Sequence, residues 1–269
     1  MILVLATPSA SQVEGPGSPF FPNFVYSSQL GIGVYEKDEL SVRVARLPFS
    51  YTLQPIEDSR WGWKLHFPVI LGHYQLESSV STRGLDPSDL SLDALSVLPG
   101  LEVLVPVRSN WLVRPFAQVG YGTDLGGGAS AWLYSSGVRS LAFWDHGETR
   151  IAFGSSLTLG GNKGTSGLGS DSYASLDLGL EIQRPIPLHL AGEPVDVGVY
   201  VAAYQFIGDL EVARFLTESL VTPRLYEVGF SFGTEEKVEI LGLGVPRLGL
   251  GYRFGSGLRG LLLNFGFPF

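Results

Sequence analysis

The sequence has no cysteine, little charge and no long apolar run. The absence of cysteine excludes disulfide frameworks, cysteine nucleophiles, zinc fingers and N-terminal lipidation. Charged residues make up only 16% of the 269 residues, whereas a soluble domain usually carries about 25%. No segment approaches the ~18 apolar residues from which a membrane-spanning helix is recognised. A helical membrane protein is therefore excluded, and the shortage of charge needs another explanation.

Further absences narrow the range of possible partners and cofactors. The net charge of −8 argues against a nucleic-acid partner. The four histidines form no cluster with metal-ligand spacing, so we expect no metal ion. Gly31-Ile32-Gly33 and the three glycines at 126–128 are not phosphate loops, because no strand-to-helix transition follows either segment. We therefore expect no cofactor.

What the sequence does contain favours strands. It has 35 glycines, 16 Phe, 11 Tyr and 5 Trp, and aromatic residues are enriched in strands. In many segments apolar and polar residues alternate, which is typical of a strand with one apolar and one polar face. Segment 172–183 shows this alternation most clearly, with Ala174, Leu176, Leu178, Leu180 and Ile182 against Tyr173, Ser175, Asp177, Gly179, Glu181 and Gln183.

The end of the chain, residues 248–269, predicts two strands joined by a tight turn. Gly255-Ser256-Gly257 supplies the residues that adopt positive φ in a hairpin turn. In the last strand Phe265, Phe267 and Phe269 share one face. A terminal row of aromatic side chains is typical of a lipid-facing strand at a membrane interface.

Phe265, Phe267 and Phe269 resemble the assembly signal of bacterial outer-membrane β-barrels, whose last strand ends in Phe and carries alternate hydrophobic residues. The sequence departs from the family pattern at Asn264, where the family favours glycine. The resemblance implies a location in the bacterial outer membrane, contact with outer-membrane lipid and lipopolysaccharide, and the barrel assembly machinery as a partner. The chain is also similar to autotransporter translocator barrels of the solitary type, which lack a passenger.

We predict an all-β fold, a single antiparallel transmembrane β-barrel of about 12 strands, with 10 as the alternative, over residues 23–269. A soluble β-sandwich is the competing architecture. Residues 1–22 are interpreted as a signal-peptide remnant and a linker, although a disordered tail explains them equally well. The three longest predicted connections, 77–90, 160–170 and 208–221, follow strands three, seven and nine, as expected if long loops face outside. Within 208–221 a helical spacing of apolar residues predicts a short surface helix.

The inward faces of the predicted strands carry charges of both signs. A barrel of this size is wider than eight strands and narrower than a sixteen-stranded porin. One interpretation is a network of paired charges that supports the interior, since buried charges must be paired. The other interpretation is a narrow polar pore. The predicted lumen network comprises Lys64, His66, Arg114, Arg150, Asp177, Glu181, Asp196, Glu227, Arg247 and Arg253.

An outer-membrane hydrolase of the lipase or protease type is the alternative function. Such chemistry needs a His base near a Ser or an activated water. His73, with Ser78 or Ser79, is the candidate at the extracellular rim. No nucleophile elbow or paired-carboxylate motif accompanies it, so we predict either a narrow polar pore or a translocator-like or structural barrel, without catalytic activity.

Overall fold

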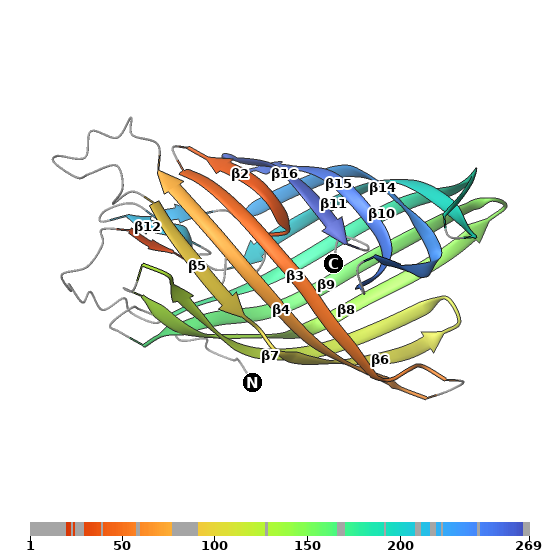
Figure 1. The fold of residues 1–269 in the computed structure, drawn as a ribbon, viewed down its shortest axis with the longest axis horizontal. Helices are drawn as coiled ribbons and strands as arrows, with labels where there is room; N and C mark the ends of the chain where they lie inside the picture. The colour runs from red at the N-terminus through yellow and green to blue at the C-terminus, as the bar shows by residue number, and fades with distance from the viewer. Residues whose placement is uncertain are drawn as a thin grey trace, which may run out of the picture.

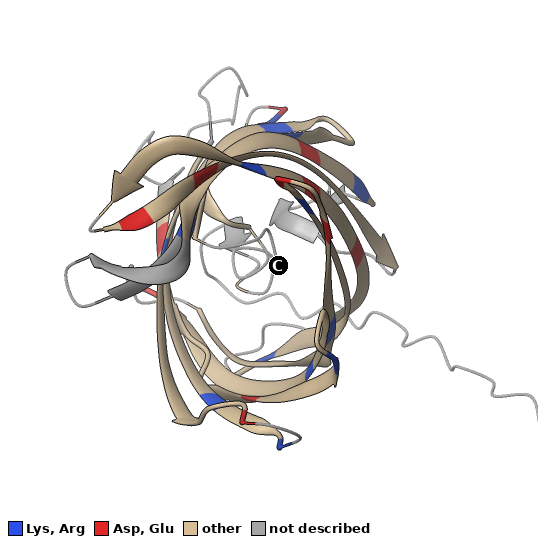
Figure 2. Cartoon of the chain, turned by 90° about the vertical axis from the view of Figure 1, so that its right-hand side faces the viewer, with Lys and Arg blue, Asp and Glu red and all other residues tan. Residues whose placement is uncertain are grey.

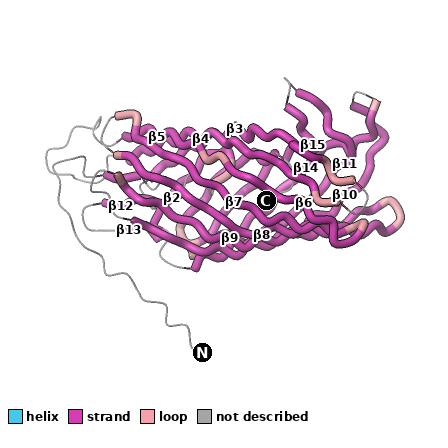
Figure 3. The backbone as a smooth tube through the Cα atoms, turned by 90° about the horizontal axis from the view of Figure 1, so that it is seen from below, coloured by secondary structure: helices cyan, strands magenta, loops and turns pink. Residues whose placement is uncertain are grey.

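The computed structural model consists almost entirely of strands (Figures 1 and 3). It describes residues 20–22, 24, 30–38, 40–57, 60–76, 91–126, 129–165, 170–190, 192–207, 211–215, 219–221, 223–240 and 243–265. Within these residues, no helix has the length and hydropathy needed to cross a membrane. The strands are β1 Phe20–Pro22, β2 Ile32–Lys37, β3 Leu40–Gln54, β4 Gly62–Leu76, β5 Ser91–Val97, β6 Gly100–Arg108, β7 Trp111–Asp124, β8 Ser130–His146, β9 Thr149–Gly164, β10 Ser170–Leu190, β11 Glu193–Ile207, β12 Glu211–Phe215, β13 Ser219–Val221, β14 Arg224–Ile240, β15 Leu243–Gly255 and β16 Leu258–Phe265.

Thirteen of these strands form one antiparallel sheet that closes on itself, as Figure 2 shows along the barrel axis. Most strands pair with their neighbours in sequence, but β5 does not pair with β6, β11 pairs with β14, and β16 closes the ring against β2. β5 and β6 occupy one position in the ring, because β4 pairs with β5 through Val69–Gln75 and with β6 through Gly62–His66. The break falls at Leu98-Pro99. The result is a closed 12-stranded barrel, which confirms the predicted fold class.

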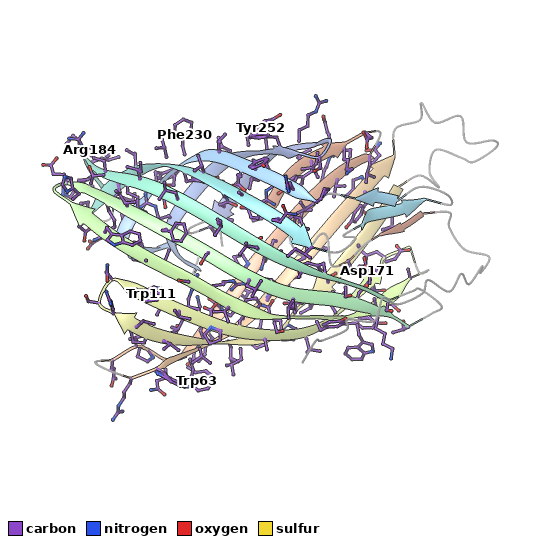
Figure 4. The ribbon with its side chains drawn as sticks, turned by 180° about the vertical axis from the view of Figure 1, so that it is seen from behind. Trp63, Trp111, Asp171, Arg184, Phe230 and Tyr252 are labelled. Carbon is purple, nitrogen blue, oxygen red and sulfur yellow. The ribbon has the colours of Figure 1, made fainter. Side chains whose placement is uncertain are left out.

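Along β10 the distribution of polarity is the reverse of that in a soluble protein. In β10 the outward Leu178 is 42% exposed, whereas the inward Glu181 is 1% exposed and Ser175 is 0% exposed. Figure 4 shows Phe230 and Tyr252 pointing away from the barrel wall, and Phe230 is 70% exposed. Such an outer wall costs free energy in water but suits a lipid environment.

The two ends of the barrel differ. Four connections at one end, here called the turn end, contain two residues each (109–110, 147–148, 191–192 and 241–242), and the fifth is 55–61. The opposite end, here called the loop end, carries the longest connections, 77–90 and 208–223. The predicted long connection at 160–170 is shorter than expected, because β9 continues to Gly164.

Exposed aromatic side chains lie on the outer wall toward both ends. Trp111 and Trp144 are near the turn end, while Tyr121 and Trp132 are near the loop end. The rings of Tyr121 and Trp132 meet edge to face, with their centroids 5.5 Å apart. Aromatic girdles of this kind flank the apolar band of membrane barrels, where amphipathic rings sit at the interfaces.

Two local predictions were wrong. The helix expected in 208–221 is replaced by β12 and β13, which form a small sheet with β1. The helical spacing there was too short to outweigh strand pairing. The first barrel strand, expected to start at Phe24, starts only at Ile32. Phe24 is 0% exposed and Leu30 is 1% exposed, so both pack inside instead of extending the wall.

Pro48 of β3 and Pro68 of β4 lie directly opposite each other in the sheet. Neither has an N–H group, but the backbone nitrogens of both point away from the ladder that the two strands share, so that ladder loses no hydrogen bond here. The Pro68 carbonyl instead accepts a hydrogen bond from the Leu98 N–H at 3.1 Å, on the side away from β3. On its other side, β3 pairs with β2 only as far as Val44 in the described part of the chain. The missing N–H of Pro48 therefore lies at an edge, where proline is tolerated.

Candidate functional site

The lumen is lined by the inward faces of the strands and holds three clusters built around buried carboxylates. The first, here called the Glu227 cluster, joins β11, β14, β15 and β16. Glu227 is 0% exposed. Its Oε2 accepts hydrogen bonds from Arg253 Nη2 at 2.8 Å, Arg253 Nε at 3.1 Å and Tyr204 Oη at 2.9 Å. Its Oε1 accepts from Tyr200 Oη and Asn264 Nδ2, both at 2.8 Å.

This cluster is both charged and aromatic. The Arg253 guanidinium lies over the Tyr204 ring, 4.3 Å from its centroid, which adds a cation–π interaction to the ion pair. Close packing depends on glycine: a Cβ on Gly251 would lie 2.8 Å from Glu227 Oε1 and closer still to the Tyr200 hydroxyl. The small residue therefore leaves space for the polar groups of neighbouring strands.

The second cluster surrounds Glu181 of β10, which is 1% exposed. Its carboxylate accepts hydrogen bonds from Ser231 Oγ and, at 2.9 Å, from Gln183 Nε2. Arg247 Nε lies 3.3 Å from Glu181 Oε1, and Arg247 Nη1 lies 3.7 Å from Asp196 Oδ2. Arg247 thus links carboxylates of two adjacent strands.

The third cluster lies in another part of the wall, on β4, β6, β7 and β8. Glu102, 1% exposed, faces three nitrogen-bearing side chains. Arg139 Nη1 is 3.0 Å from Glu102 Oε2, whereas His66 Nε2 and Arg114 Nη1 are 3.4 Å and 3.9 Å from Oε1. The Arg139 guanidinium also lies 4.1 Å from the centroid of the Phe116 ring.

The structure places seven of the predicted lumen residues in these clusters and the other three elsewhere. His66, Arg114, Glu181, Asp196, Glu227, Arg247 and Arg253 lie in the clusters. Asp177 accepts a hydrogen bond from Ser175 at 3.4 Å, and Lys64 is a half-buried residue of β4. Arg150 instead pairs with Asp145 at 2.8 Å beside the turn at 147–148, at the rim of the turn end.

Sequence reasoning missed several members, including Glu102, Arg139, Tyr200, Tyr204 and Asn264. Glu102 could have been found, because the alternation of Leu101, Val103 and Val105 places it on the opposite, inward face. Arg139 offered no comparable signal, since the Ser135-Ser136-Gly137 segment before it does not alternate.

Nearer the loop end, the lumen is filled by an apolar layer. Phe24 and Leu30, which precede β2, belong to one buried cluster with side chains from around the wall, among them Tyr74 of β4, Leu133 of β8 and Phe206 of β11. A Cβ on Gly122 of β7 would lie 2.9 Å from Phe24 Cδ1, so the ring packs directly on that strand.

Other predicted positions lie outside this lumen. His73 is on the outer wall, where its Nδ1 is 2.6 Å from Asp93 Oδ1, and its proposed partners Ser78 and Ser79 lie outside the described residues. Phe265 is 42% exposed at the end of β16, whereas Phe267 and Phe269 lie outside the described residues. No group of three or more His, Cys, Asp and Glu side chains in the described part of the chain has metal-binding geometry.

The arrangement is suited to holding the barrel wall from within. Each of the three central carboxylates faces at least one cationic side chain, and Glu227 is saturated with hydrogen-bond donors. A saturated, ion-paired carboxylate is a poor base, because abstracting a proton would break these contacts. These clusters therefore connect strands, and their geometry favours support over proton transfer.

No protein-family model matches the sequence, and no curated protein sequence is detectably similar to it. Among solved structures, the β domain of the Bordetella autotransporter BrkA is similar over 87% of this chain and 96% of that chain, with 9% sequence identity and a TM-score of 0.54. At this identity the similarity concerns the fold and carries no residue role. The chain therefore has the fold of an autotransporter β domain, a closed 12-stranded antiparallel β-barrel.

Proposed function

We propose that this protein is a translocator-like, structural barrel of the bacterial outer membrane, with a lumen closed by its own residues and no catalytic role. The autotransporter β-domain fold and the apolar outer wall support the membrane location. The alternating aromatic row Phe265, Phe267 and Phe269 supports insertion by the barrel assembly machinery.

The main support for a closed lumen is that the residues at its centre are buried. Glu227 and Tyr35 are both 0% exposed, as are Phe24 and Tyr74 of the apolar layer. In an open pore, inward polar groups would face water and remain accessible. The paired network is thus a better account of these residues than a narrow polar pore.

The route of the chain supports the translocator-like part of the proposal. β1 pairs with β12, which lies in the connection between β11 and β14 at the loop end. Phe24 and Leu30 are then buried in the lumen, and β2 runs back toward the loop end. The segment ahead of the first barrel strand therefore enters from the loop end, as a threaded polypeptide would.

Planar-bilayer conductance of the refolded protein tests the closed lumen. We expect no stable open channel in the full chain, and a conducting channel when residues 1–31 are deleted, because the deletion removes Phe24 and Leu30. Deleting residues 1–19 is the matched control and should leave the lumen closed. A stable, large conductance of the full chain would contradict the proposal.

The absence of catalysis is tested separately at His73. The side chain lies on the lipid-facing wall and is paired with Asp93, so it lacks a water-filled site in which to act as a base. Ester and peptide hydrolysis by the refolded barrel should stay at the level of buffer alone. An activity that His73→Ala removes would establish the hydrolase instead.

A further inference from the structure

The outer wall near the loop end contains a hollow of about 500 Å³ where β2, β3, β4 and β5 meet. Its apolar lining includes Val34, Ala45, Leu71 and Leu125. Val34 is 47% exposed and Leu71 is 44% exposed, so the hollow opens outward and not into the lumen. The small side chain of Ala45, between larger neighbours, leaves the space unfilled.

The polarity of the wall changes at this hollow. Arg43, His73 and Asp93 are aligned across β3, β4 and β5 and form a transverse row on the outward face. The next outward positions toward the loop end, Ser41 and Gln75, are polar. In the other direction the next positions are Ala45 and Leu71, which begin the apolar band. The row therefore marks the level at which the lipid headgroups meet the acyl chains.

Among the described residues, Arg43 is the cation of that row for which no ion pair is found. His73 Nδ1 is engaged with Asp93 Oδ1 at 2.6 Å, whereas exposed Arg43 has no ion-pair partner in the described part of the chain. A guanidinium at the edge of a lipid phase is stabilised by an anion, and its planar fork matches phosphate. The apolar hollow directly below it offers a place for an acyl chain.

We propose that this hollow binds one molecule of lipopolysaccharide through its lipid A part, with a phosphate on Arg43 and an acyl chain against Ala45 and Leu71. The choice of lipopolysaccharide rests on the proposed outer-membrane location, in which the loop end faces outside and the hollow lies in the outer leaflet. Charge complementarity and the level of the hollow both fit a phosphorylated, acylated lipid.

A second hollow on the outer wall serves as a comparison for the hollow at Arg43. It measures about 270 Å³ and lies on β10, β11 and β14, with Ala203 below Arg224. Arg224 Nε already donates a hydrogen bond to Gln205 Oε1 at 2.6 Å. The smaller volume and the engaged guanidinium make this the weaker site, so it serves as the control.

Native mass spectrometry of the folded barrel in detergent, titrated with bisphosphorylated lipid A, tests the assignment. We expect one retained lipid A in the parent and roughly tenfold weaker retention in Arg43→Gln, the loss expected for one charge-assisted phosphate contact. Arg224→Gln should retain lipid A as the parent does. Ala45→Phe, which fills the hollow from the outward face, should also weaken retention, and heat-modifiable migration shows whether each variant is folded.

Two further ligands define what would overturn the proposal. Dephosphorylated lipid A should bind the parent about as weakly as lipid A binds Arg43→Gln. Equal retention of phosphatidylglycerol and lipid A would overturn the choice of lipid, and equal retention of lipid A by Arg43→Gln and the parent would overturn the site. Because binding is measured on purified barrels, failure here leaves the conductance test of the proposed function untouched.

Discussion

Arg253 donates both its Nε–H and its Nη2–H to a single oxygen, Oε2 of Glu227, at 3.1 Å and 2.8 Å. The pair joins β15 to β14, while Asn264 and Tyr200, which hydrogen-bond to Oε1, bring in β16 and β11. Since β16 also closes the ring against β2, this one carboxylate connects the closing strand to the preceding wall.

Replacing Glu227 by Gln should strongly destabilise the barrel. The change leaves the buried Arg253 charge without its partner, which typically costs about 3 to 5 kcal/mol. Glu36→Gln is the control, because the Glu36–Arg259 pair, at 2.8 Å, is on the exposed outer surface, where such pairs contribute about 0.2 to 1 kcal/mol. The temperature at which each folded band converts to the unfolded band in SDS gels measures the difference. Equal conversion temperatures would show that the buried pair contributes no more than the exposed one.

Two inward glycines of β15 should differ in their tolerance of alanine. A methyl on Gly251 would press on Glu227 and Tyr200, whereas a methyl on Gly249 would have its nearest neighbour, Asn264 Cβ, at an ordinary 3.4 Å. Gly251→Ala should destabilise the barrel by about 1 to 3 kcal/mol, the usual cost of overpacking, while Gly249→Ala should be nearly neutral. Thermal conversion measured by tryptophan fluorescence compares them, and the reverse order would contradict the described packing.

A charge on the outer wall should hinder insertion according to its depth. Leu178 lies well inside the long strand β10, whereas Leu190 is its last residue at the turn end. Leu178→Arg should cost about 2 to 4 kcal/mol if the side chain lies near the bilayer midplane, and Leu190→Arg should cost about 0 to 1 kcal/mol. Refolding into lipid vesicles, followed by heat-modifiable migration, measures both. Equal yields would argue against a lipid-facing role for this face.

The C-terminal residue should matter for assembly. Deleting Phe269, or replacing it with Ser, removes part of the family-like aromatic row and should reduce the protein recovered in the outer membrane far more than the protein secreted to the periplasm. Pro268→Ala should be milder, because Pro268 alternates with that row. Fractionation and immunoblotting give the two levels. Unchanged membrane levels after deletion would remove Phe269 from the assembly signal.

The two ends of the barrel should face opposite compartments. An epitope inserted between Pro19 and Phe20 should be accessible to antibody on intact cells, because β1 pairs with β12 at the loop end. An epitope inserted between Gly147 and Glu148, in a tight connection at the turn end, should become accessible only after the outer membrane is permeabilised. The opposite result would invert the proposed orientation.

The barrel was predictable because alternation is a property of each strand alone. Leu178 and Leu180 predict an outward face whatever their neighbours are, and the same rule identified Glu181 and Glu227 as inward. Pairing across strands was not predictable in this way. Joining Glu227 to Arg253, or Glu102 to Arg139, requires the register between strands, which periodicity within one strand does not supply.

The start of the barrel shows another limit of local patterns. Phe24 and Leu30 fit an apolar strand as well as they fit an apolar filling of the lumen, since burial in either place satisfies them. The prediction of a helix in 208–221 was wrong for a related reason. Its short helical spacing competed with pairing to Phe20–Pro22, a segment distant in sequence.

The facing prolines of β3 and β4 have a consequence for how this hairpin assembles. A slip of one residue would turn the proline nitrogen of one strand toward the shared ladder, where a hydrogen bond would be missing. It would also turn the phenylalanine of that strand, Phe49 or Phe67, inward. The lost hydrogen bond and the misplaced aromatic side chain both disfavour the same shifted register. Pro48 and Pro68 therefore favour the observed register of this hairpin over registers shifted by one residue.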